Sequence, residues 1–399
     1  MHNSTDLLFR GHVVVIAGNY PAPGHERHVF VQQLVHAMID RGICITVLAP
    51  QSIVHSWVYK ERLLPNVSLG ITPQGNSYTI YRPYIITMGN YHFLSGILNW
   101  WNRRIINKML KKLSPEVLYA HFWSSALYVN LYASHYKIPL FVACGEGDNA
   151  IEEMVKTMSS RELEKLTSAV TGVISVSSVN KRKCIKYHLA EDDMIGVFPN
   201  CVDTNLFRQL DKRQCRLRLN LPLDDFIIVF VGGFIPRKGG EKLAHAISLI
   251  EDSTIKVMFI GKPFPGYSFD FDCPGIIHKG PVEHNKLPLF LNAADIFVLP
   301  TQNEGCSNAI VEALSVGIPV VSSDRAFNDD ILDEENSIRV DPNDVQAIRE
   351  AILRLKNNPQ LYFKMREVSN RRHSLYSVER RAQRIISFIQ NHLSTNVEQ

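Results

Sequence analysis

Short apolar runs alternate with amphipathic stretches along the first half of the chain. The uninterrupted apolar runs predict buried strands, and a stretch with apolar residues three and four positions apart predicts a helix. The predicted strands cover residues 12–18, 43–50, 117–122, 139–145 and 172–177, and the helix covers residues 30–42. Strands separated by helical patterns predict a parallel sheet with helices on both faces.

A second series of the same kind follows residues 199–207, PNCVDTNLF, whose Pro and Asn residues indicate a turn. Its predicted strands cover residues 226–234, 255–261, 296–300 and 319–323, and its helices cover residues 239–250, 284–293, 308–316 and 344–356. We therefore predict an α/β protein with domains at residues 1–200 and 201–376 and a C-terminal helix within residues 377–399. Ligands of open parallel sheets bind outside the carboxyl ends of the strands, so the expected site is the cleft between the domains.

Composition supports a globular protein of about two domains. The chain has 399 residues, of which 45% are hydrophobic and 21% are charged, and its formal net charge is +4. Residues 1–190 contain 19 Lys and Arg against 11 Asp and Glu, whereas the remainder contains 24 against 28. A basic first half suits an anionic partner such as phosphate-bearing lipid, and plain solubility explains it equally well. The small net charge and the lack of a recognition motif argue against a nucleic-acid partner.

The cysteines and the apolar segments bear on the compartment. The seven cysteines are scattered, odd in number and without CxxC spacing, which predicts thiols in a reducing compartment and neither a disulfide framework nor a zinc site. Residues 1–18 lack the long apolar core of a signal peptide, and no segment approaches the roughly 18 apolar residues of a membrane span. We therefore expect a cytoplasmic protein.

Two glutamates, Glu304 and Glu312, lie eight positions apart in the segment EGCSNAIVE. Loop-forming residues precede Ser307, and Ser307 or Asn308 is a good N-cap for the apolar run that begins at Ala309. The free amide groups of the first helical turn attract a phosphate, and each carboxylate can accept hydrogen bonds from sugar hydroxyls. This pattern indicates a nucleotide-sugar site. The simpler alternative is a helix start where the dipole favours acidic residues.

Two cations, Arg237 and Lys238, follow the predicted strand at residues 226–234 and precede Gly239 and Gly240. Cations at the carboxyl end of a parallel strand, beside a glycine pair, can clamp a diphosphate because charge-assisted hydrogen bonds to phosphate are strong. A solvated surface pair is the alternative.

Several of these segments together resemble the retaining glycosyltransferases of family 4, which have the GT-B fold. They are PNCVDTNLF, VGGFIPRKGGEKL, HKGPVEHNKLPLFLNAADIFVLPTQNEG and EGCSNAIVEALSVGIPVVSSD. The signature is a pair of glutamates separated by seven residues, met by Glu304 and Glu312, in a context that includes Gly317 and Pro319. The resemblance covers nearly the whole chain and is strongest over about residues 199–345. It implies two Rossmann-like domains facing across a cleft, with the C-terminal helix crossing back to the first domain.

The resemblance also implies the reaction and the residues that carry it. A sugar would move from a nucleoside-diphosphate sugar to a saccharide or lipid-linked acceptor, in polysaccharide or glycolipid biosynthesis, without a metal or cofactor. Glu312 would bind the ribose hydroxyls, Glu304 would face the donor sugar, and Lys238 with Arg237 would neutralise the leaving diphosphate. The other donor-binding positions would be Ser307, Asn308, Ala309, Gly305, Gly233 and Val282.

Two positions depart from the family pattern. The family usually has an arginine where this chain has Gly233, and Arg237 is the candidate that supplies the missing charge. A first-domain loop that commonly reads HGSD or HTS is CGEGD here, so that Gly145 replaces the histidine. Glu146 and Asp148 then become the candidates that face the acceptor.

The turn after the first predicted strand contains Gly18 and Gly24 but no GxGxxG fingerprint, which argues against a dehydrogenase. A glycine at a helix entry still permits close approach to a ligand, and ordinary turn chemistry is the alternative. By the resemblance, residues 23–29, which include Gly24, form the glycine loop near the donor phosphates and the acceptor.

Residues 98–113, LNWWNRRIINKMLKKL, predict a helix with an apolar face and a basic face. Such a helix can rest on an anionic membrane or on a lipid-linked acceptor, which would place the protein at the inner face of the cell membrane. The alternative is an ordinary helix whose apolar face packs on the domain core.

Two other functions share this fold. A GT-B sugar-nucleotide epimerase would form product without an acceptor. A catalytically silent binding or scaffold subunit would explain the altered clamp and the lost histidine. For a transferase, retention by front-face attack and retention through a carboxylate adduct both stay open.

Overall fold

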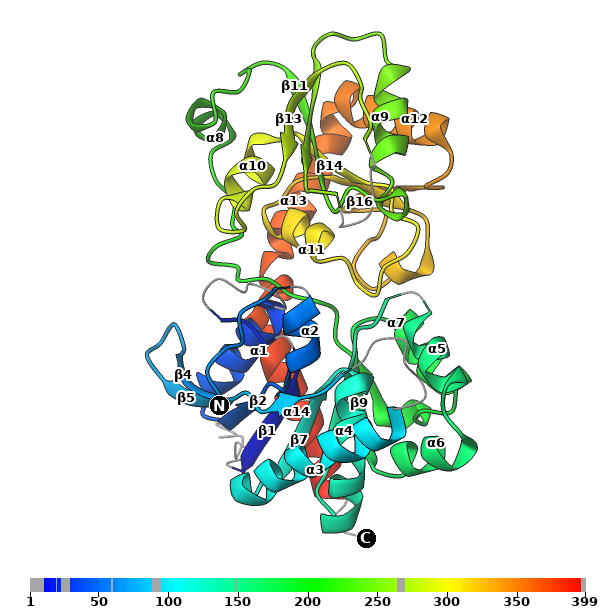
Figure 1. Ribbon diagram of the computed structural model, residues 1–399. Coiled ribbons are helices and arrows are strands. Elements are labelled where there is room, and N and C mark those ends of the chain that lie inside the picture. The colour runs from blue at the N-terminus through cyan, green and yellow to red at the C-terminus, as the bar shows by residue number, and fades with distance from the viewer. Residues whose placement is uncertain are drawn as a thin grey trace, which may run out of the picture. The chain divides into compact units, whose positions relative to one another are not determined.

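The computed structural model describes residues 11–18, 20–22, 29–58, 60–87, 95–147, 149–263 and 270–395. The chain divides into two compact units, the first comprising Met1–Phe198 with Arg381–Gln399 and the second comprising Pro199–Arg380. Each unit contains its own β-sheet with helices packed around it (Figure 1).

The sheet of the first unit has eight strands within the described residues, in the order β10-β9-β8-β7-β1-β2-β5-β4. They are β1 (His12–Ala17), β2 (Cys44–Leu48), β4 (Val67–Ile71), β5 (Ser77–Tyr81), β7 (Val117–His121), β8 (Leu140–Cys144), β9 (Val170–Ser175) and β10 (Ile195–Val197). All neighbours are parallel except β4 and β5. Every residue of β7 and β8 is buried, because helices cover both faces of a parallel sheet.

Helices connect and cover these strands. They are α1 (Val29–Ile39), α2 (Ile53–Val58), α3 (Ser95–Leu113), α4 (Trp123–Tyr136), α5 (Ala150–Lys156), α6 (Ser160–Thr167), α7 (Ser178–Lys186) and the C-terminal α14 (Val378–Thr395). A two-stranded sheet pairs β3 (Gln51–Ser52) with β6 (Tyr84–Ile85). In α14 the Ile385 side chain is fully buried, and the Phe388 ring lies 5.4 Å from that of Phe198.

The sheet of the second unit is fully parallel, with the order β13-β12-β11-β14-β15-β16 in the described residues. Its strands are β11 (Phe226–Val231), β12 (Ile255–Ile260), β13 (Ile276–Gly280), β14 (Ile296–Leu299), β15 (Val320–Ser323) and β16 (Ser337–Val340). Its helices are α8 (Lys212–Arg218), α9 (Gly240–Ser248), α10 (Leu287–Ala293), α11 (Asn308–Ser315), α12 (Val345–Asn357) and α13 (Pro359–Arg371). The central strands β12, β11, β14 and β15 carry the buried apolar runs of the sequence.

The predicted strands and helices are confirmed, with ends that differ by a few residues. The apolar pattern missed β4, β5, β10, β13 and β16. These strands are at or next to a sheet edge, and half-exposed residues interrupt their apolar runs, as in β13 and β4. A strand covered on one side only has no reason to be continuously apolar.

The helix predicted over residues 98–113 is α3, and its apolar residues divide into two groups. Ile106 and Leu110 are fully buried in the core of the first unit, so packing on the domain core is correct for this face. Trp100 and Trp101 remain 58% and 50% exposed. The pattern alone does not separate the two groups, because both fit one amphipathic helix.

Candidate functional site

The strand order of the second unit reverses between β11 and β14. The first strand of this unit, β11, runs between β12 on one side and β14 on the other, so the connections that leave β11 and β14 diverge to opposite faces of the sheet. In open α/β sheets ligands bind at the carboxyl ends of the strands at such a point. The loops after β11 and β14 contain Lys238 and Glu304, respectively.

These two loops bring an ammonium group and a carboxylate together. Lys238 Nζ donates to Glu304 Oε1 at 2.5 Å, and Thr301 Oγ1 donates to the same oxygen at 2.9 Å. The side chains of Lys238 and Glu304 are 18% and 11% exposed. The pair is therefore held in a largely dehydrated setting, where charges interact more strongly than in bulk water.

Arg237 adds a second cation to this cluster. Its Nη1 lies 3.8 Å from Glu304 Oε2 and donates to the Asn303 carbonyl at 2.5 Å. The loop depends on Gly239, which has φ +76°, and a Cβ added there would lie 2.2 Å from the Pro300 carbonyl oxygen. Glycine therefore lets the loop that carries both cations approach the end of β14.

The second glutamate, Glu312, lies in α11 with its side chain 9% exposed. Its Oε1 is 3.0 Å from His284 Nε2. The sequence predicts Ser307 or Asn308 as the N-cap of this helix, and the structure has Ser307 at that position. The Ser307 side chain makes no capping hydrogen bond. The Oδ1 of Asn308 is buried and has no hydrogen-bond partner among the described residues. The amide groups of the first turn of α11 therefore receive no capping hydrogen bond from the Ser307 side chain.

The remaining predicted donor residues lie in loops or at the start of α11. Gly233 is half-buried after β11, Val282 is half-buried after β13, and Gly305 is buried after β14, while Ala309 is half-buried in the first turn of α11. All of these loops follow parallel strands, whose carboxyl ends meet at one edge of the sheet. The sequence patterns do not identify His284 as a site residue. The one local signal is that it lies two residues after Val282, a predicted donor-binding position.

In the first unit, Gly24 and Asp148 lie outside the described residues, and Glu146 lies near the start of α4. Its carboxylate accepts hydrogen bonds from the backbone N–H groups of Trp123, at 2.9 Å, and Gly145, at 3.0 Å. Burial raises the pKa of Glu146, although these backbone N–H groups act in the opposite direction. A Cβ added to Gly145 would lie 3.0 Å from the Phe122 ring. A histidine at position 145 would therefore require the neighbouring side chains to move.

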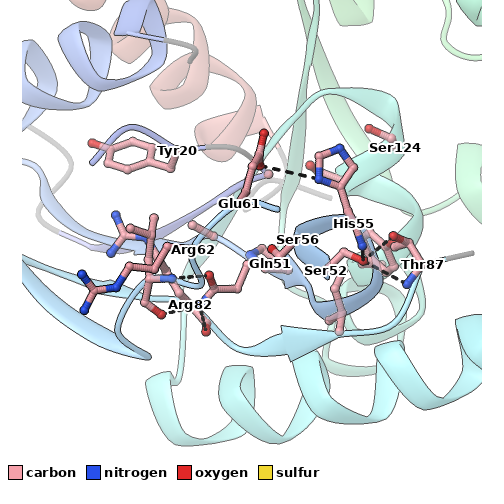
Figure 2. Close-up of a pocket in the computed structure, with 17 residues that line it drawn as sticks. Tyr20, Gln51, Ser52, His55, Ser56, Glu61, Arg62, Arg82, Thr87 and Ser124 are labelled. Carbon is pink, nitrogen blue, oxygen red and sulfur yellow. Dashed lines mark hydrogen bonds and ion pairs between the residues drawn. The ribbon is translucent and has the colours of Figure 1, made fainter. Parts of the chain in front are cut away.

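The first unit also contains a cavity of about 310 Å³, here called the first-unit pocket (Figure 2). It lies where β1 neighbours β7, the point at which the strand order of this sheet reverses. Residues that follow β1, β2, β5 and β7, together with α2 and the loop after it, line the pocket. They include Gly18, Tyr20, Gln51, Ser52, His55, Ser56, Glu61, Arg62, Arg82, Thr87, Ser124 and Tyr128. Glu146 is not among its described lining residues.

The described residues contain neither a candidate metal site nor a candidate membrane-spanning helix. No group of three or more His, Cys, Asp or Glu side chains in the described ranges is placed to hold a metal ion. Within the same ranges, none of the helices has both the length and the apolar character needed to cross a membrane.

Sequence comparison relates both units to glycosyltransferases. The family model described as Glycosyltransferase Family 4 matches residues 22–206, and that described as Glycosyl transferases group 1 matches residues 225–358. TuaC of Bacillus subtilis, assigned as a teichuronic acid biosynthesis glycosyltransferase, is 26% identical over 86% of this chain and 89% of its own length. The UDP-Gal:alpha-D-GlcNAc-diphosphoundecaprenol alpha-1,3-galactosyltransferase of Escherichia coli is 24% identical over 70% of this chain and 76% of its own length.

Solved structures show the same fold. Sucrose-phosphate synthase from Thermosynechococcus elongatus superimposes with a TM-score of 0.74 at 17% identity, covering 97% of this chain and 100% of that chain. Anabaena Alr3699/HepE in complex with UDP gives a TM-score of 0.71 at 14% identity, covering 96% and 100%.

The chain therefore belongs to glycosyltransferase family 4 and has the GT-B fold. Its activity is that of a glycosyltransferase. The family and the glycosyltransferase activity that the sequence resemblance implies are confirmed.

Proposed function

We propose that this enzyme transfers a sugar from a nucleoside-diphosphate sugar to a saccharide or lipid-linked acceptor, with retention of the anomeric configuration and without a metal ion. The observation that carries the proposal is the Lys238–Glu304 pair, which lies near the first turn of α11 at the strand-order reversal of the second unit. This arrangement offers cations, free amide groups and carboxylates to one ligand, and a nucleotide sugar needs all three.

Cleavage of the donor leaves negative charge on the diphosphate and positive charge on the sugar. Lys238 and Arg237 supply two cations to the departing diphosphate, and the amide groups at the start of α11 add the positive end of a helix dipole. Two preorganised cations can serve the charge-neutralising role that a metal ion has in other transferases. The same two cations also contact Glu304, at 2.5 and 3.8 Å.

Glu304 is assigned the position beside the reacting sugar. Its Oε1 already accepts hydrogen bonds from Lys238 and Thr301, so this oxygen is engaged in holding the cation that meets the diphosphate. That engagement favours an electrostatic and positioning role over nucleophilic attack. Front-face attack, with the leaving phosphate as the base, is accordingly the preferred route to retention.

Glu312 is assigned to the ribose hydroxyls, with His284 as its positioning residue. The imidazole Nε2 lies 3.0 Å from the carboxylate, and the His284 ring packs 5.2 Å from the Phe207 ring. A buried carboxylate held in one orientation can accept hydrogen bonds from two vicinal hydroxyls without first losing rotational freedom.

The relatives support the donor and acceptor classes. The name of the E. coli enzyme specifies a UDP-sugar donor and a diphosphoundecaprenol-linked acceptor, and that of TuaC specifies teichuronic acid biosynthesis. The HepE structure contains UDP. These similarities favour a role in polysaccharide or glycolipid synthesis, with a UDP-sugar as the first donor to test.

A calorimetric screen of the purified enzyme against UDP-, GDP- and ADP-sugars tests the donor assignment. One donor should bind to the wild type, and Glu312→Ala should abolish that binding, whereas the exposed-site control Glu283→Gln should bind normally. The product's anomeric configuration, read by NMR, then tests retention. Binding that is unaffected by Glu312→Ala, or an inverted product, would contradict the proposal.

Peripheral contact with an anionic membrane is part of the proposal, and exposed residues of the first unit support it. Trp100 and Trp101 in α3 and Trp57 in α2 are 58%, 50% and 81% exposed. The exposed basic residues of α3 are Arg104, Lys108, Lys111 and Lys112. Exposed tryptophans beside cations suit the boundary between lipid headgroups and acyl chains.

Flotation with anionic vesicles at low and high salt tests this contact. The wild type should float in a salt-dependent way, and the double variant Trp100→Ala/Trp101→Ala should remain at the bottom of the gradient. Phe363→Ala, an equally exposed aromatic position in the second unit, is the matched control. Equal flotation of all three proteins would exclude these tryptophans from the contact.

A further inference from the structure

Arg82 is a buried cation in the wall of the first-unit pocket. It is 3% exposed, and its donors reach neutral acceptors, with Nη1 at 2.5 Å from Ser68 Oγ and Nη2 at 3.2 Å from the Pro21 carbonyl. Its Nε is buried without a hydrogen-bond partner among the described residues. No carboxylate in the described part of the chain forms an ion pair with it, and burial lowers its pKa.

A buried guanidinium without a carboxylate is costly, since the charge has left water and gained only neutral partners. An anion bound beside it would offset part of that cost. The pocket wall therefore contains a buried charged donor whose acceptors among the described residues are neutral.

Arg62 provides a second guanidinium to the same pocket. Its side chain is exposed and makes no hydrogen bond or ion pair with another described residue. In the view of Figure 2, Arg62 and Arg82 lie on the side of the pocket away from His55 and Thr87. The pocket therefore has a basic side.

The other side of the pocket is rich in hydroxyl groups. Ser52 and Thr87 hydrogen bond to each other at 2.6 Å, whereas the hydroxyls of Ser56 and Ser124 make no hydrogen bond to another described residue. One carboxylate, that of Glu61, also lines the pocket, and it pairs with His55 at 3.7 Å. The two arginines outnumber it, so the net charge of the wall stays positive.

We propose that the first-unit pocket binds an acidic sugar unit of the acceptor, with its anionic group at Arg62 and Arg82 and its hydroxyls at Ser56 and Ser124. The inference rests on the proposed transferase function and adds the class of acceptor. The volume of about 310 Å³ is at the small end for ligand pockets, which suits a single sugar ring. A sugar carboxylate and a sugar phosphate share the required chemistry.

Ligand-observed NMR and calorimetry on the full chain test the inference with four probes. Glucuronic acid and glucose 1-phosphate represent the carboxylate and the phosphate, glucose is the neutral sugar, and inorganic phosphate is an anion without a ring. We expect at least one acidic sugar to bind about tenfold or more tightly than glucose and than phosphate, because each hydrogen bond to a charged group is worth about one to two decades of affinity.

Arg62→Gln should remove that preference and leave donor binding unchanged, since Arg62 is exposed and its loss does not disturb a core. Lys60→Gln is the matched control, because Lys60 is an exposed cation two residues away that does not line the pocket. Arg82→Lys, which keeps the charge but loses the fork of donors, should weaken the acidic sugar to a smaller extent.

Several results would overturn the inference. They are failure of both acidic sugars to bind, equal affinity for glucose and the acidic sugars, or equal effects of Arg62→Gln and Lys60→Gln. Donor binding in the second unit is measured separately. Donor binding without an acidic-sugar preference would refute only this inference, whereas acidic-sugar binding without any nucleotide-sugar binding would refute the proposed function.

Discussion

Replacing Lys238 by methionine tests the assignment of the leaving-group cation. The substitution keeps a side chain of similar length and removes the ammonium group that lies 2.5 Å from Glu304 Oε1. Loss of one preorganised group that stabilises developing negative charge lowers kcat by about 10²–10³, or about 3–4 kcal/mol. We expect a loss of that size at saturating donor, measured as released nucleoside diphosphate.

The same change should also destabilise the second unit. Glu304, 11% exposed, would keep Thr301 at 2.9 Å and Arg237 at 3.8 Å but lose its nearest cation. A buried polar group left short of partners costs about 1–3 kcal/mol of unfolding free energy. For a domain of this size, each kcal/mol lost lowers Tm by roughly 2–4 °C.

A second substitution separates catalysis from stability. In Lys238→Met/Glu304→Gln the uncompensated carboxylate is gone, so the double variant should regain part of the lost Tm relative to Lys238→Met. It should not regain activity, because the diphosphate still lacks its cation. Wild-type kcat in Lys238→Met, or recovery of activity together with stability in the double variant, would refute the assignment.

Three further predictions concern other parts of the molecule. Glu312→Gln should raise the donor Kd about 30- to 100-fold by calorimetry, because each of two hydrogen bonds falls from about 1.5–3 kcal/mol with a charged acceptor to about 0.5–1.5 kcal/mol with a neutral one. A change no larger than that of Glu283→Gln would count against the ribose assignment. Gly239→Ala should lower Tm more than Gly42→Ala. Both glycines have positive φ, but a Cβ at Gly239 would lie 2.2 Å from a backbone oxygen, whereas a Cβ at Gly42 would have nothing within 4 Å. Equal losses of Tm would show that the contact at Gly239 relaxes freely. The pKa of Glu146 is raised, so the folded state holds a proton to higher pH than the unfolded state. The wild type should therefore gain Tm relative to Glu146→Gln as pH falls toward the unfolded pKa of about 4.5. It should lose that gain as pH rises through the folded pKa. A pH-independent Tm difference would refute the burial argument.

Much of the fold was predictable because the buried central strands carry continuous apolar runs. β7 and β11 are examples, and helices such as α12 show clear periodicity. Edge strands such as β4 and β13 were not predictable in this way, since partial exposure interrupts their apolar pattern. For α3, the pattern identified the helix but did not separate the buried Ile106 from the exposed Trp100.

The candidate site shows the same division. The glutamate pair, the adjacent cations and their family context were evident along the chain, and they led to glycosyltransferase family 4. By contrast, the contact between His284 and Glu312 joins residues 28 positions apart, and Arg82 and Ser68 meet across 14 positions. No periodic pattern encodes such pairs, because hydrophobic spacing specifies which face of an element is buried and not which loop lies beside it.

The sequence by itself determined the buried central elements, the family and the chemical types of the candidate donor-site residues. The tertiary structure decided which of them meet. Lys238 and Glu304 are 66 positions apart, and they touch because β11 and β14 are neighbours at the point where the strand order reverses. The first-unit pocket likewise exists because β1 lies beside β7, which brings residues from distant parts of the chain to one end of the sheet. Strand order depends on the packing of the whole unit, so local patterns along the chain do not reveal it.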